Sequence, residues 1–248
     1  MMVREPTNEI PVVILAGGNP ADLQGCLQPK ACVMVAGRSM LAHVLALYTA
    51  KGFRRFTVCS GNGHDQVARV ADVLRESPAA TQGHDLDLRV VFTGDQAGTA
   101  HRIRKAMQLW PHARTVAVSY VDIVSDVDLV AVLETHNKEQ VAVTLTAVNL
   151  PTRFKPLGVN LFTARVRGLA SRPITEDTLV SGGFYFIDRE RFSAAVPKWS
   201  EHESFEQETL PSLAAVASLA YHKHDGYWQP IDSGRDVRTA EGFLAPGE

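Results

Sequence analysis

The 248-residue sequence is poor in cysteine and carries no excess of either charge, and both features exclude whole classes of protein. Its cysteines, Cys26, Cys32 and Cys59, are an odd set without Cys-x-x-Cys spacing, which argues against a disulfide framework and a zinc site. The formal net charge of -2 offers no basic field for a polyanion, so we expect no nucleic-acid partner. We therefore expect reduced thiols and a small ligand.

Long hydrophobic runs are also absent. The first ten residues, MMVREPTNEI, are polar, and no later apolar run approaches the length of roughly 20 residues that spans a bilayer. We find no internal repeat, low-complexity tract or flexible linker. The sequence therefore predicts a cytoplasmic protein without a membrane partner, folded as a single domain over residues 1–248.

Short apolar runs alternate with helical patterns in the first half of the chain. Strands are expected at 11–15, 56–60, 88–92 and 115–119, and helices at 40–48, 66–75 and 99–110. This alternation predicts an α/β fold with a Rossmann-like, mainly parallel sheet and helices on both faces.

The second half reads differently. Ser125, with Asp128 three residues later, predicts a capping box that opens a helix to about Asn137. The segments 141–148, 157–162 and 179–187 are strand candidates with few helices between them, so we expect added antiparallel strands. Further helices are expected to start at Ser204 and to occupy about 235–243.

A series of short motifs then suggests a family. In chain order they are AGG, PK, TGD, SYVDIV, SGGFYFID, FEQETL and GYWQPIDSGRD. Their order and spacing resemble the sugar-1-phosphate nucleotidyltransferases, and most of all the glucose-1-phosphate cytidylyltransferases, over nearly the whole chain. The resemblance implies a nucleotide-binding half in 1–150 and a sugar-binding half in 151–248, with a soft boundary.

The resemblance also implies a reaction. A sugar 1-phosphate attacks the α-phosphorus of a nucleoside triphosphate, CTP being favoured, and pyrophosphate leaves, with Mg²⁺ as the cofactor. The implied partners are the triphosphate and a sugar phosphate or nucleotide sugar, as in nucleotide sugar biosynthesis. The oligomeric state stays open, a homo-oligomer included.

Site residues follow from the matching positions. Asp122 and Asp232 match the metal-binding aspartates, and Lys30 matches the lysine of the P-K motif, so these three are the catalytic candidates. The nucleotide-binding candidates are Leu15, Ala16, Gly17, Gly18, Thr99 and Arg102. The sugar-binding candidates are Gly182, Gly183, Glu206, Tyr227 and Trp228.

Each candidate also has a purely structural interpretation. Asp122 would begin a turn, Asp232 would cap the last helix, and Lys30 would be an exposed loop lysine. Thr99 and Arg102 would belong to an ordinary helix start, and Gly182 and Gly183 would form a simple bulge. Glu206 would compensate the dipole of its helix, and Tyr227 and Trp228 would pack in the core. Asp126 and Asp128 resemble a D-x-D metal motif, but capping is the better interpretation.

The first loop departs from the family pattern. Where the family has G-G-x-G-T-R-L, this sequence has GGNPADL, so Pro20 replaces a glycine and Asp22 replaces the phosphate-binding arginine. The loss of the hydrogen bond between arginine and phosphate, together with the repulsion between a carboxylate and the phosphate, would weaken the interaction with the triphosphate by about 5 kcal/mol. Val121 and Ile123 stand where the family has glycines, and Lys155 and Arg172 depart in the sugar half. Two further functions therefore stay open: a catalytically silent binding homologue with a supporting role, and an altered reaction in the same pocket.

Overall fold

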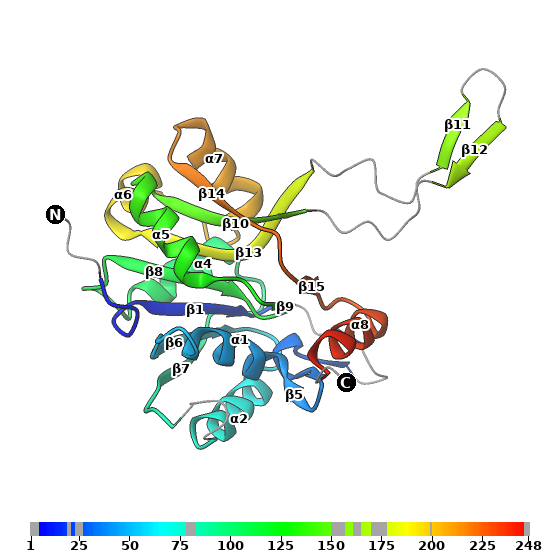
Figure 1. Cartoon of the computed structure of the whole chain (residues 1–248). Coiled ribbons are helices and arrows are strands. Elements are labelled where there is room, and N and C mark those ends of the chain that lie inside the picture. Colours follow the sequence, from blue (N-terminus) through cyan, green and yellow to red (C-terminus); the bar gives the residue numbers. More distant parts are fainter. Residues whose placement is uncertain are drawn as a thin grey trace.

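The computed structural model describes residues 5–18, 21–22, 27–77, 83–149, 157–160, 165–169, 178–198 and 200–245. A seven-stranded sheet in the order β14-β10-β13-β8-β1-β6-β7 forms its centre (Figure 1). The strands are β1 (Pro11–Ala16), β6 (Arg55–Ser60), β7 (Asp87–Phe92), β8 (Thr115–Tyr120), β10 (Val143–Asn149), β13 (Leu179–Asp188) and β14 (Leu219–His224). Only β13 runs antiparallel to its sheet neighbours, β8 and β10, so the predicted α/β fold with a mainly parallel sheet and added antiparallel pairing is confirmed.

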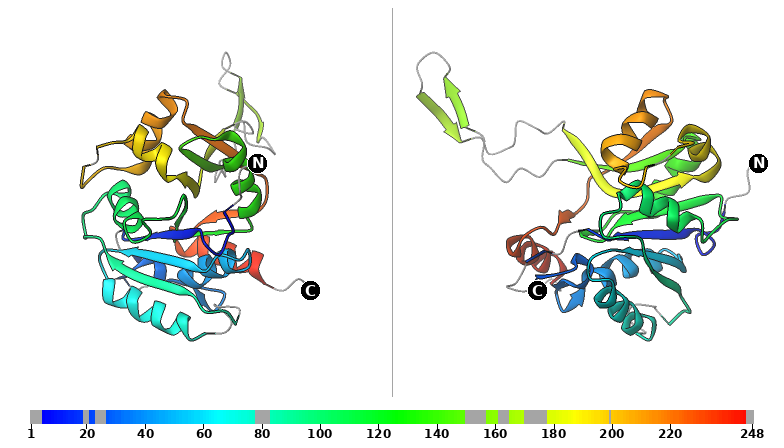
Figure 2. Two further views of the ribbon diagram at one scale, coloured as in Figure 1. Left: turned by 90° about the vertical axis from the view of Figure 1, so that its left-hand side faces the viewer. Right: turned by 180° about the vertical axis from the view of Figure 1, so that it is seen from behind.

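Helices cover both faces of this sheet, as Figures 1 and 2 show. One face packs against α1 (Met40–Thr49), α2 (His64–Arg75) and α5 (Leu129–Glu139). The other packs against α4 (Thr99–Met107), α6 (Arg189–Ala195), and α7 (Leu210–Ala215) with the π-helix Phe205–Thr209 that precedes it. The alternation of β1 explains this division, because Val12 and Ile14 point into the first core and Val13 and Leu15 into the second.

Smaller elements complete the described chain. The last helix, α8 (Gly234–Leu244), packs with the β4–β5 hairpin against a third apolar cluster that includes Val33, Ile231 and Val237. The remaining elements are β2 (Ala21–Asp22), β3 (Leu27–Gln28), η1 (Lys30–Cys32), β4 (Met34–Val35), β5 (Arg38–Ser39), β9 (Ile123–Ser125), β11 (Leu157–Asn160), β12 (Arg165–Leu169) and β15 (Trp228–Pro230). Within the described ranges, no helix has both the length and the apolar character needed to cross a membrane.

Two local predictions were wrong. Ser125 does not cap α5, because it lies in β9 and its hydroxyl donates to Tyr227 O at 2.8 Å. Asp128 is itself the N-cap and accepts from Val130 N at 3.1 Å. The helix α6 was missed; its N-cap is Asp188, the last residue of β13, which accepts from Arg191 N at 3.0 Å.

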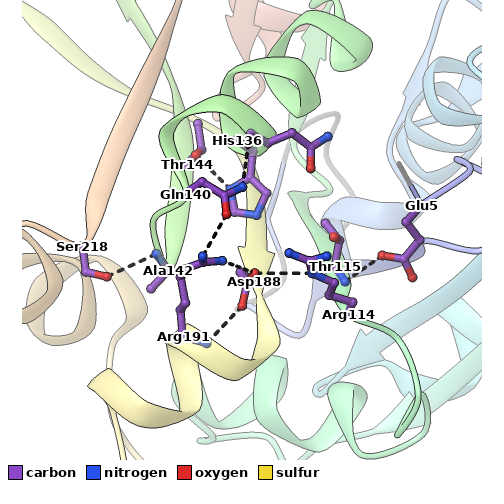
Figure 3. A network of polar contacts seen from close by, with 11 residues as sticks. Glu5, Arg114, Thr115, His136, Gln140, Ala142, Thr144, Asp188, Arg191 and Ser218 are labelled. Carbon is purple, nitrogen blue, oxygen red and sulfur yellow. Dashed lines mark hydrogen bonds and ion pairs between the residues drawn. The ribbon is translucent and has the colours of Figure 1, made fainter. Parts of the chain in front are cut away.

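A polar network joins the ends of strands on the side of the sheet away from the carboxyl end of β8 (Figure 3). The Asp188 carboxylate pairs with Arg191 at 2.7 Å, and Arg191 also donates to Gln140 Oε1 at 2.9 Å. Nearby, His136 Nδ1 lies 2.9 Å from Thr144 Oγ1. Burial lowers the pKa of His136 to about 4, so its imidazole is neutral at physiological pH.

Candidate active site

A cavity of about 400 Å³ opens at the carboxyl ends of β1 and β8. This is the edge at which open α/β sheets bind ligands. Its lining includes all six predicted nucleotide-binding residues: Leu15, Ala16, Gly17, Gly18, Thr99 and Arg102. Lys30 and Asp122 line it as well. The structure thus brings together segments that are far apart in the sequence.

Sequence reasoning missed part of this lining. Asp95, Gln96 and Ala97 follow β7, and Tyr120 and Val121 end and follow β8. The position of these residues directly after predicted strands could have identified them, because loops at the carboxyl ends of parallel strands meet at one edge of a sheet. That signal applies to the TGDQAGT segment as much as to the AGG segment.

The three catalytic candidates meet at this edge. Lys30 Nζ lies 2.7 Å from Asp122 Oδ2 and 2.7 Å from Asp232 Oδ1. Lys30 begins η1 directly after Pro29, Asp122 follows β8, and Asp232 precedes α8. The interpretation of Asp232 as the cap of the last helix is wrong, since Ser233 is the N-cap and its hydroxyl accepts from Asp236 N.

The two carboxylates stabilise the positive charge of Lys30. Burial acts to lower the pKa of Lys30, but the charges and hydrogen bonds of Asp122 and Asp232 outweigh it and raise that pKa above its ordinary value. Lys30 is therefore a cation throughout the physiological pH range. The interpretation as a solvated loop lysine does not describe a side chain that is only 26% exposed and bound to two carboxylates.

Arg102 lies beneath the glycine turn after β1. Its Nη2 donates to Gly17 O at 2.8 Å, its Nη1 donates to Ser60 O at 3.0 Å and to Thr93 Oγ1, and its Nε donates to Ala97 O at 3.1 Å. A longer contact of 3.5 Å joins Nη2 to Asp95 O. Every acceptor is a neutral oxygen, and the side chain belongs to a residue that is 4% exposed. Arg102 is therefore a buried cation that ties together the ends of β1, β6 and β7.

Glycines make this arrangement possible. A Cβ at Gly17 would collide with the Arg102 guanidinium, and a Cβ at Gly61 would lie 2.8 Å from Gly17 O and 3.0 Å from Gly94 O. Each of these glycines follows a strand, namely β1, β6 or β7. The strand ends can approach the guanidinium closely because they carry no side chain there.

Thr99 and the start of α4 are bound to the rest of the protein. Thr99 Oγ1 accepts from Phe205 N at 2.8 Å, Gly98 N donates to Glu201 O at 2.8 Å, and Ala100 N donates to Glu203 O at 3.1 Å. Two amides at the start of the helix, those of Gly98 and Ala100, thus have partners outside it. The start of α4 therefore holds the segment before α7 in place. Thr99 is the first residue of α4, after the N-cap Gly98, and its hydroxyl oxygen is bound to Phe205 N, so a role in nucleotide binding stays a prediction.

Glu206 joins two tyrosines beside the cavity. Its Oε2 accepts from Tyr120 OH at 2.7 Å and its Oε1 accepts from Tyr185 OH at 2.9 Å. Burial, together with the charge of Glu206, raises the pKa of both tyrosines, so both phenols stay protonated and donate. Glu206 lies in a π-helix, a feature that is frequent at functional sites.

Gly182 and Gly183 form an irregular segment of β13. The pairing of β13 with β10 shifts between Leu145 and Ala147, opposite these glycines, and Gly183 has φ +77°. Gly182 O accepts from Trp228 Nε1 at 2.9 Å. The backbone at Gly182 and Gly183 therefore forms the irregularity that the structural interpretation expects. A role of these glycines in sugar binding stays a prediction.

Tyr227 and Trp228 are not among the described residues that line the cavity. Tyr227 stacks on Phe243 of α8 with ring centroids 3.7 Å apart, and Trp228 packs against the core around β1 and α1. Core packing accounts for both rings as the structure has them. Asp126 likewise has a structural role, since it accepts from Tyr227 N at 2.7 Å.

Several positions of interest lie outside the described residues. These are Asn19, Pro20 and Leu23 in the first loop, Cys26, and Lys155 and Arg172 in the second half. Ala21 and Asp22 are described as backbone only, in β2, which pairs with β3.

Two aspartates at this edge fit a divalent cation in part. Magnesium is commonly held by one or two carboxylates together with substrate phosphates. Asp122 and Asp232 converge on one point, as their shared contact with Lys30 Nζ shows. Among the described residues, no three His, Cys, Asp or Glu side chains form a group able to hold a metal ion. A cation here would therefore complete its coordination with oxygens of water or of a bound ligand.

The mainly parallel sheet with helices on both faces is the Rossmann-like fold of a nucleotidyltransferase. Residues 12–174 match the family model of the MobA-like NTP transferase domain, and the chain belongs to that family.

Individual relatives extend this comparison over the whole chain. The chain is 27% identical to glucose-1-phosphate cytidylyltransferase of Salmonella typhimurium, over 95% of this chain and 96% of that protein. It is 25% identical to a probable glucose-1-phosphate cytidylyltransferase of Bacillus subtilis, over 91% and 92%. Among solved structures, HddC from Yersinia pseudotuberculosis shares the fold with a TM-score of 0.71 at 17% identity, over 95% of this chain and 99% of that one. The predicted resemblance to this family is confirmed.

Proposed function

We propose that the protein transfers the nucleotidyl group of a nucleoside triphosphate to a sugar 1-phosphate and releases pyrophosphate, with CTP as the preferred triphosphate and Mg²⁺ as the cofactor. The observation that carries this proposal is the contact of Lys30 with both Asp122 and Asp232 beside the cavity. The names of the Salmonella and Bacillus relatives support the choice of CTP and glucose 1-phosphate.

The reaction needs charge neutralisation and alignment more than covalent help. An oxygen of the sugar phosphate forms a bond to the α-phosphorus while the bond from that phosphorus to the β-phosphate oxygen breaks. Asp122 and Asp232 would hold Mg²⁺, which supplies Lewis-acid stabilisation of the phosphate charge when bound. Lys30 would bind a phosphate oxygen as a point charge.

The residues around this cluster would position the nucleotide. Backbone amides of Gly17 and Gly18 lie at the turn after β1, a common place for phosphate binding. Arg102 adds a buried positive charge whose hydrogen bonds all end on neutral oxygens. This charge favours an anionic ligand in the cavity, although the guanidinium itself is occupied with the strand ends.

One observation favours a second candidate function. Asp22 stands where related enzymes carry a phosphate-binding arginine, so the first loop has exchanged a cation for an anion. A carboxylate in the place of that arginine would repel the phosphates of a triphosphate instead of binding them. The second candidate is a catalytically silent homologue that binds a nucleotide or a nucleotide sugar and supports a partner.

A pyrophosphate-release assay tests the proposal. The purified protein is offered each nucleoside triphosphate with a panel of sugar 1-phosphates and Mg²⁺, and we expect the highest kcat/KM with CTP and glucose 1-phosphate. Asp122→Asn and Asp232→Asn should each lower kcat by at least about 100-fold, because each removes a charge that acts on the transferring group. Asp128→Asn, which alters the cap of α5, is the matched control and should retain activity.

The two candidate functions give different results. Turnover with none of the substrate pairs, together with a melting temperature that rises with Mg²⁺ and a nucleotide, would select the silent homologue. Unaltered turnover by both Asn variants would refute the proposed site.

A further inference from the structure

The ammonium of Lys30 lies where two carboxylates converge. It is within 2.7 Å of Asp122 Oδ2 and 2.7 Å of Asp232 Oδ1. Asp122 is 23% exposed and Asp232 is 55% exposed, so neither carboxylate is sealed from solvent. The cluster carries two negative charges and one positive charge in a small volume.

A divalent cation would use the same oxygen atoms. Carboxylate oxygens are the ligands that hard cations prefer, and an ammonium competes for them as a point charge. Lys30 and a metal ion therefore cannot both occupy the point between Asp122 Oδ2 and Asp232 Oδ1. Removal of the ammonium would leave two like charges facing each other, which a cation would relieve.

Only the side chain of Lys30 has to move for this exchange. Its backbone is fixed in η1, where Lys30 O accepts from Val33 N at 3.2 Å and Pro29 O accepts from Cys32 N at 2.8 Å. The side chain has a flexible stem of four carbons, and it lines the same cavity as Gly17 and Gly18. A phosphate bound at the glycine turn is a second anionic partner for the same ammonium.

We propose that Lys30 is an internal counter-cation that competes with a divalent metal ion for Asp122 and Asp232, and that couples metal binding to nucleotide binding. The metal ion displaces the ammonium from the carboxylates, and the phosphates of the nucleotide bind the displaced ammonium. Each ligand thereby makes room for the other, so each raises the affinity for the other by the same factor. The inference rests on the metal role of both aspartates in the proposed function.

Binding of Mn²⁺ in the absence of nucleotide tests this competition. The free Mn²⁺ signal in electron paramagnetic resonance is titrated with wild-type protein and with Lys30→Met. We expect Lys30→Met to bind Mn²⁺ about tenfold more tightly, which corresponds to about 1.4 kcal/mol for two partly exposed contacts. The matched control is Lys51→Met, which removes the same charge from a lysine paired with Asp128 at 3.6 Å, and it should bind as the wild type does.

Two further measurements separate the competition from a general charge effect. The double variant Lys30→Met/Asp232→Asn should lose the gain in Mn²⁺ affinity. CTP should raise the Mn²⁺ affinity of the wild type by a larger factor than that of Lys30→Met, because the variant has no ammonium to transfer. If Lys30→Met does not fold, Lys30→Gln serves the same purpose, and Mn²⁺ should raise its melting temperature more than that of the wild type.

Mn²⁺ binding by Lys30→Met that is equal to or weaker than that of the wild type would overturn the inference. The failure of the proposed function would look different. Tighter Mn²⁺ binding by the variant with no turnover by the wild-type protein would uphold the competition and refute the transferase reaction. Turnover by the wild type without tighter Mn²⁺ binding by Lys30→Met would uphold the transferase reaction and refute the competition.

Discussion

Replacement of Arg102 by methionine distinguishes a structural cation from a ligand-binding one. Methionine keeps most of the buried stem and removes the guanidinium. The strand ends then lose the donors to Gly17 O, Ser60 O, Thr93 Oγ1 and Ala97 O. Net hydrogen-bond contributions are about 1 kcal/mol each, and part of this loss is offset because a charge no longer has to be buried. We expect the free energy of unfolding to fall by about 2–4 kcal/mol.

Urea denaturation measures this loss, and two variants frame it. Arg102→Lys keeps the charge but has fewer and differently directed donors, so its loss of stability should be intermediate. Arg104→Met, an exposed position on the same helix, is the control and should change the free energy of unfolding by less than about 0.5 kcal/mol.

Calorimetric titration of the same proteins with CTP completes the comparison. If Arg102 ties the strand ends together, Arg102→Met should lower the free energy of unfolding. Any loss of CTP affinity in this variant would then be a consequence of the displaced turn at Gly17. The structural role would be refuted if the free energy of unfolding of Arg102→Met lay within about 0.5 kcal/mol of the wild-type value while its affinity for CTP was lost. That result would assign the guanidinium to the phosphates.

Two further predictions concern stability. His136 has a folded-state pKa of about 4 against about 6.5 when unfolded, so protons bind the unfolded chain preferentially between these values. The free energy of unfolding should therefore fall by up to about 3 kcal/mol as the pH drops from 6.5 to 4, and urea denaturation of His136→Gln should show less of this dependence than the exposed control His84→Gln. Gly183→Ala should lower the free energy of unfolding by about 1–3 kcal/mol, because Gly183 has φ +77° and a Cβ would collide with Ile123. The same measurement on Gly18→Ala, where nothing lies within 4 Å of an added Cβ, should show a small change, and equal stability of both alanine variants would contradict this reasoning.

The local elements could be predicted from the sequence for a local reason. Buried parallel strands read as apolar runs, so the run from Pro11 to Leu15 identifies β1 within one residue. Ser39 directly precedes the helix expected at 40–48 and caps α1, accepting from Ala42 N at 3.2 Å, and such a cap depends only on neighbours within one helical turn. The failure at Ser125 has the same origin, since two nearby polar residues competed for one cap and a distant carbonyl, Tyr227 O, took the serine hydroxyl.

The site depended on distances that the sequence does not express. Lys30 is 92 residues from Asp122 and 202 residues from Asp232, and the three meet because β8 ends beside β1 and the chain returns to this edge before α8. The motifs named these residues as candidates, but only the fold placed the ammonium between the carboxylates. Arg102 shows the same limit more sharply. Its sequence position on a helix after β7 suited a ligand contact, whereas three strand ends, brought together by parallel pairing, use its hydrogen-bond donors. A side chain whose partners are distant in the sequence can be assigned them only when the tertiary structure has decided which donors and acceptors share one place.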